Sequence, residues 1–109
     1  MVRRVLGKPV RLGLCLLAGA MITSPTIFAA DEGADAAWKY HCMTCHGEDG
    51  KSNAQRYPNL AGQNSMYLVS RLKYFRDGIE PGNQMNAQAA PLSDEVIQIL
   101  ADYYSSQAN

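Results

Sequence analysis

The sequence predicts an all-α domain of three main helices joined by two long loops. Three segments carry apolar residues at helical spacing, and no long alternating strand pattern, repeat or low-complexity tract is present. The length of 109 residues suits one small domain. With 47% hydrophobic and 18% charged residues, wholesale disorder is excluded.

The first thirty residues have the order of a secretory signal peptide: a basic start, a short apolar core and small residues before a cut site. The apolar run of residues 14–22 follows four basic residues and ends at Thr23-Ser24-Pro25. A spanning helix needs about twenty apolar residues. We therefore expect cleavage after Ala29 or Ala30, and no membrane span in the domain that remains, residues 31–109.

Residues 31–109 carry six basic and ten acidic side chains, a net charge of −4. A domain this acidic lacks the basic patch that nucleic acid requires, so that class of partner is excluded. We expect the basic side chains to form a solvated face: Lys39, Lys51, Arg56, Arg71, Lys73 and Arg76.

The first helix is predicted from Gly33 to about Cys45, with Ala34, Trp38 and Cys42 four residues apart on one face. The second is predicted over Ser65–Asp77, because polar Asn64 precedes it and Gly78 suits a helix C-terminus.

The third helix is predicted over Ser93–Tyr104. It begins with a Ser cap, followed by Asp94 and Glu95, which favour the positive end of a helix.

The loops Gly47–Gln63 and Gly78–Leu92 are polar and too long for a compact domain unless something organises them. A domain of about 80 residues also tends to lack core and to need a staple. We expect a bound apolar group to supply the missing interior.

Cys42-Met43-Thr44-Cys45-His46 is the C-x-x-C-H pattern of c-type haem attachment. Two thiols one helical turn apart can add to the two vinyl groups on one edge of a haem. His46 then falls beneath the iron and can donate an imidazole nitrogen.

Three other interpretations of the motif have less support. A disulfide between Cys42 and Cys45 would close a very small loop. A thioredoxin-type pair needs a preceding strand. A zinc site needs four converging ligands, whereas His41 and the motif crowd all nitrogen and sulfur donors into six residues.

From Gly33 onward the chain resembles the class I c-type cytochromes, in particular the small bacterial periplasmic branch of single-haem proteins and the halves of dihaem ones. Four segments carry the resemblance: residues 42–50, 57–63, 67–78 and 92–104. It implies a fold wrapped around one covalent haem c. It also implies a periplasmic one-electron carrier of a Gram-negative bacterium: a non-catalytic, monomeric protein that shuttles electrons between redox protein partners.

Met85 is the expected sixth ligand of the iron, since it stands where the family places its distal methionine, before an L-S-D-E helix. Met43 lies inside the attachment turn, and His41 lies on the same side as His46. Met66 lies at the start of the second helix, where a methionine usually packs in the core or lies on the surface. Met/His ligation is the pattern of a cytochrome c.

The resemblance also implies that the Pro58 carbonyl accepts a hydrogen bond from the His46 imidazole. Ala34, Trp38 and Tyr103 are predicted to form the crossing of the first and last helices. The walls of the haem site are predicted to be Tyr67, Leu68, Leu72 and Phe75.

Two other functions stay open from the sequence. The first is a haem-based ligand sensor or weak peroxidase, which requires an open sixth position. The second is a fixed electron-transfer subunit of a larger dehydrogenase or oxidase.

Overall fold

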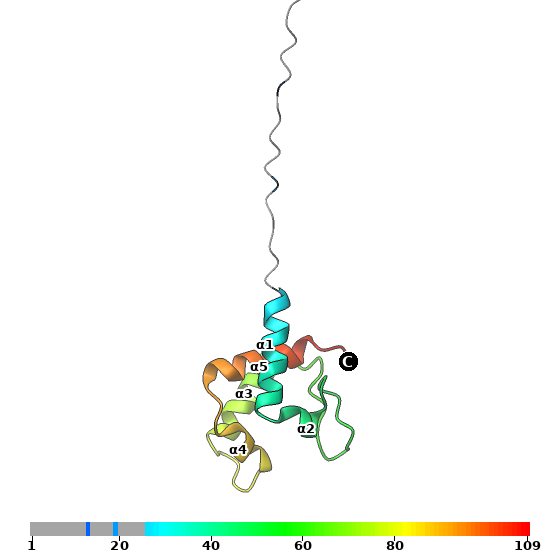
Figure 1. The fold of residues 1–109 in the computed structure, drawn as a ribbon. Coiled ribbons are helices and arrows are strands. Elements are labelled where there is room, and N and C mark those ends of the chain that lie inside the picture. The colour runs from blue at the N-terminus through cyan, green and yellow to red at the C-terminus, as the bar shows by residue number, and fades with distance from the viewer. Residues whose placement is uncertain (1–12, 14–18, 20–25) are drawn as a thin grey trace, which may run out of the picture.

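The computed structural model describes Gly13, Gly19 and residues 26–109. Most of the expected signal peptide therefore lies outside the described residues. The described part contains helices and no strand, which confirms the all-α prediction (Figure 1). The helices are α1 (Thr26–Lys39), α2 (Cys42–His46), α3 (Ser65–Arg76), α4 (Gln84–Ala89) and α5 (Asp94–Ser106). No helix in this part is long and apolar enough to cross a membrane.

The predicted second and third helices are confirmed as α3 and α5, together with their caps. The Asn64 side chain accepts a hydrogen bond from the Tyr67 amide at 3.0 Å, and Ser93 accepts one from Val96 at 3.2 Å. Gly78 follows α3 with a φ of 65°, a conformation that glycine adopts without steric cost.

The predicted first helix is wrong in its extent, because the structure divides it into α1 and α2. Tyr40 and His41 separate them, and His41 has a left-handed φ of 59° that turns the chain. The start of α1 at Thr26 also precedes the expected Gly33, and the helix continues across the expected cut site.

The second predicted loop contains a short helix, α4, that the sequence analysis did not predict. Asn83 caps it by accepting a hydrogen bond from the Met85 amide at 2.8 Å. The Asn86 side chain donates to the Glu80 carbonyl at 2.6 Å and holds the preceding turn. This segment lacks the apolar stripe that marks a longer helix.

α1 crosses α5 through small residues (Figure 1). Gly33 and Ala37 are buried, and a Cβ on Gly33 would overlap the Tyr103 side chain. The prediction that Trp38 packs at this crossing is wrong: Trp38 is 73% exposed, and Ala34 is only partly buried. Close approach of two helices requires small residues at the contact, which leaves the indole outside it.

The buried core lies mainly between α3, α4 and α5. It contains Leu68, Ala89, Leu92, Ile97, Leu100, Ala101 and Tyr104, with Ala37 from α1. At its edge the Arg76 guanidinium contacts Asp94 at 2.6 Å and the Leu92 carbonyl at 3.2 Å. Hydrogen bonds from Arg76 and Lys73 lower the pKa of Asp94.

We predict that Gly33→Val destabilises the protein and that Trp38→Ala does not. Overpacking at the α1–α5 crossing should lower the free energy of unfolding by about 1–3 kcal/mol. Loss of the exposed indole should change it by about 0.5 kcal/mol or less. Denaturant unfolding of both variants measures this, and a larger loss in Trp38→Ala would contradict the assignment of the buried face.

Candidate functional site

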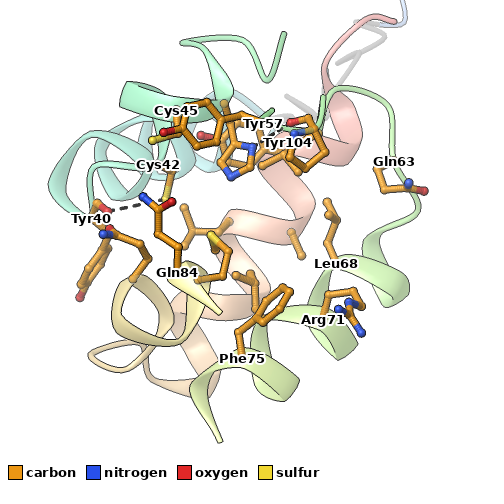
Figure 2. Close-up of a pocket in the computed structure, with 18 of the residues that line it drawn as sticks. Tyr40, Cys42, Cys45, Tyr57, Gln63, Leu68, Arg71, Phe75, Gln84 and Tyr104 are labelled. Carbon is orange, nitrogen blue, oxygen red and sulfur yellow. Dashed lines mark hydrogen bonds between the residues drawn. The ribbon is translucent and has the colours of Figure 1, made fainter. Parts of the chain in front are cut away.

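One cavity of about 830 Å³ gathers the predicted site residues (Figure 2). Its lining comes from residues 40–42 and 44–46, the following loop, α3, α4 and α5. The predicted walls Tyr67, Leu68, Leu72 and Phe75 all line it, as do Leu100 and Tyr104 from α5. Its size and its apolar and aromatic walls suit a large, flat, hydrophobic ligand.

His46 projects from the end of α2 and is only 7% exposed. Its Nδ1 lies 2.8 Å from the Pro58 carbonyl oxygen, the partner that the family resemblance implies. A carbonyl oxygen can only accept, so Nδ1 carries the proton. In this tautomer of the neutral imidazole Nε2 keeps its lone pair, and the ring is oriented to bind a metal through it.

Cys42 and Cys45 line the cavity and are partly buried free thiols (Figure 2). The Cys42 thiol contacts the Tyr40 carbonyl at 4.0 Å. Burial raises the pKa of Cys42 to about 11, so this thiol is protonated at neutral pH. Two thiols on one wall of the cavity can form thioether bonds to a bound partner.

The disulfide, thioredoxin and zinc interpretations have no counterpart in the described part of the chain. Cys42 and Cys45 are not bonded to each other. Over the described ranges no strand precedes the motif. Among the same residues, no group of three or more His, Cys, Asp or Glu side chains could hold a metal ion.

Met85 lies in α4 and is partly buried, and it lines the same cavity as His46. The alternatives differ in position. Met66 is 81% exposed, and Met43 packs against the core without lining this cavity. His41 lines the cavity but is exposed.

Tyr104 is a site residue that entered the sequence analysis only as the end of the third predicted helix. It is 3% exposed and lines the cavity, and its hydroxyl has no hydrogen-bond partner among the described residues. Burial raises the pKa of Tyr104. The available signal was its spacing, one helical turn after Leu100 and Ala101.

The loop after α2 is fastened to the site through its backbone. The Gly50 carbonyl accepts hydrogen bonds from Leu60 at 2.7 Å and Ala61 at 3.1 Å. Gly62 donates to the Tyr104 carbonyl at 2.9 Å. These bonds place Pro58 beside the imidazole. The cavity, the two thiols and the oriented imidazole together fit a covalently attached haem.

Comparison with known proteins decides the family. Residues 29–103 match the family described as "Cytochrome C oxidase, cbb3-type, subunit III". The chain belongs to this family. It is a c-type cytochrome with the class I fold, and its cofactor is haem c, attached covalently through Cys42 and Cys45.

Several cytochromes c are similar to it. Cytochrome c-554(548) of Halomonas halodenitrificans is 49% identical over 69 residues, which cover 61% of this chain and 83% of that protein. Cytochrome c4 of Pseudomonas aeruginosa is 34% identical over 97 residues, which cover 89% of this chain and 48% of that protein. This cytochrome thus spans about half the length of cytochrome c4.

Solved structures agree with this relationship. The cytochrome c4 structure from Acidithiobacillus ferrooxidans has a TM-score of 0.64 at 33% identity, covering 72% of this chain and 49% of that one. Reduced cytochrome c4 from Pseudomonas stutzeri has a TM-score of 0.65 at 26% identity, covering 74% and 49%.

We predict that the left-handed turn at His41, which directs Cys42 to the cavity, is sensitive to side-chain shape. His41→Val should lower the free energy of unfolding by about 1–2 kcal/mol, because a β-branched residue tolerates a positive φ poorly. His41→Asn should be nearly neutral, since Asn adopts this conformation readily. Denaturant unfolding followed by haem absorbance tests both, and equal losses would contradict the role of the turn.

Proposed function

We propose that this cytochrome is a periplasmic one-electron carrier whose haem iron is held between His46 and Met85. The observation that carries the proposal is that an oriented imidazole and a thioether line one cavity together with both attachment cysteines. In the exported protein, the signal peptide is removed after Ala29 or Ala30, and residues 31–109 form a monomeric, single-haem domain.

When bound, the haem supplies an iron that gains and loses one electron. The protein residues set the conditions for that exchange. The Pro58 carbonyl fixes the imidazole, so His46 meets the iron in one orientation. Met85, on the same cavity, would supply a soft thioether ligand, which favours ferrous iron and raises the reduction potential. Held by both residues, the iron would leave no open site for oxygen or peroxide.

The partners that fit such a carrier are redox enzymes. Two relatives, from Thiomonas intermedia and Stutzerimonas stutzeri, are named "Thiosulfate dehydrogenase electron acceptor". These names support a dehydrogenase as the class of donor. The same relatives support a non-catalytic role for this chain, which accepts electrons and passes them on.

We predict that Met85→Ala abolishes the weak far-red sulfur-to-iron charge-transfer band of the oxidised protein. The ferrous variant should then bind carbon monoxide without denaturant, and its reduction potential should fall, because the thioether no longer stabilises ferrous iron. Visible spectroscopy and a redox titration of the purified periplasmic protein provide the measurements.

Met66→Ala is the matched control, because Met66 is 81% exposed on α3. It should keep the band and exclude carbon monoxide as the wild type does. A wild-type spectrum that is high-spin and lacks the band would overturn Met85 ligation and favour the ligand sensor or weak peroxidase.

The description of the family as an oxidase subunit favours a second candidate, a fixed subunit of a larger complex. Size-exclusion chromatography of the native protein distinguishes the two. A free carrier elutes as a single chain, whereas a subunit elutes with a larger enzyme that carries its own redox centre.

A further inference from the structure

The cavity that binds the haem is unevenly charged. Its lining includes two arginines, Arg56 and Arg71, and no aspartate or glutamate. Residues 31–109 as a whole carry a net charge of −4. The cavity lining is therefore positively charged although the domain as a whole is acidic. Such a lining suits a ligand that carries negative charge of its own. Haem does so, through its two propionate groups.

The attachment motif fixes the side of the cavity toward which those propionates point. Haem carries its vinyl groups on one edge and its propionates on the opposite edge. Bonds to Cys42 and Cys45 hold the vinyl edge beside α2. The propionates must then point to the other side of the cavity, where Figure 2 shows Arg71 and Gln63 across from the two cysteines.

Arg71 is held in place and has no acidic partner in the part of the chain that the structure describes. Its guanidinium lies 4.4 Å from the centre of the Tyr74 ring and 4.7 Å from that of Phe75. Arg76, five residues later on α3, instead contacts Asp94 at 2.6 Å. Stacking leaves the planar fork of Arg71 ordered and free to bind a carboxylate through two parallel hydrogen bonds.

We propose that Arg71, assisted by the Gln63 amide, binds a haem propionate and is a positioning residue for the cofactor. The inference rests on haem attachment through Cys42 and Cys45, and it is independent of the identity of the sixth ligand. The positive charge keeps the propionate ionised, and it favours ferrous iron over ferric iron.

Arg71 acts among a small set of groups that titrate or carry charge. The others that line the cavity are Arg56 and Tyr57 from the loop, Tyr40, His41, Cys42, Cys45 and His46 before and within α2, Tyr67 on α3 and Tyr104 on α5. Arg56 is the one that permits a matched comparison. Like Arg71 it stacks on an aromatic ring, that of Tyr57 at 4.8 Å, but it is exposed. Replacing it by Gln removes the same unit of positive charge.

The test is the pH dependence of the reduction potential of the haem-loaded protein, measured by spectroelectrochemistry. In Arg71→Gln the potential should fall at neutral pH. The pH at which it begins to decline should rise by about one to three pH units, because an ionised carboxylate loses its opposite charge. In Arg71→Lys the onset should lie between those of the wild type and Arg71→Gln, since lysine keeps the positive charge but cannot form two parallel hydrogen bonds. Arg56→Gln should leave the onset of the decline at the wild-type pH.

An onset in Arg71→Gln equal to that of the wild type would overturn the proposal, as would a larger change in Arg56→Gln. Thermal unfolding followed by haem absorbance shows whether each variant is folded. The far-red band of Arg71→Gln separates this outcome from a failure of the proposed function. The band depends on ligation of the iron by Met85, whereas the pH at which the potential begins to decline depends on ionisation of the propionate.

Discussion

Haem, held through Cys42 and Cys45, occupies a cavity of about 830 Å³ in a domain whose own core is small. Among the described residues, the only large side chains that are fully buried are Ile97 and Leu100. A domain of this size has only a marginal apolar core of its own. The faces of α3 and α5 that line the cavity gain their apolar partner from the cofactor, and the thioether bonds keep that partner in place.

The other elements hold the site residues in position around this cavity. The left-handed turn at His41 separates α2 from α1, so that one short helix presents two thiols and an imidazole to the cavity. The Gly50 carbonyl and the Gly62 amide fasten the following loop, which carries Pro58 to the imidazole. On the other side, the Asn83 cap begins α4 and places Met85 on the same cavity.

Sequence reasoning succeeded where a local rule applied. The caps Asn64 and Ser93 and the apolar stripes fixed α3 and α5, and the C-x-x-C-H spacing located the attachment site. It failed where tertiary contact decided the outcome. The spacing of Ala34, Trp38 and Cys42 suggests one continuous helix that buries these residues. The chain instead breaks at the left-handed His41. Close crossing with α5 buries Gly33 and Ala37 in place of the predicted residues. The roles of Tyr104 and Arg71 depend on which wall of the cavity each faces, and no linear pattern encodes that.

The central claim is that the haem completes the core, and the most direct measurement compares unfolding with and without attachment. Far-ultraviolet circular dichroism would follow thermal unfolding of residues 31–109 as the haem-loaded protein and as the double variant Cys42→Ala, Cys45→Ala prepared free of haem. We expect a single cooperative transition for the loaded protein. The variant should show weak helical signal and no cooperative transition. A native-like spectrum with a cooperative transition in the haem-free variant would contradict the account.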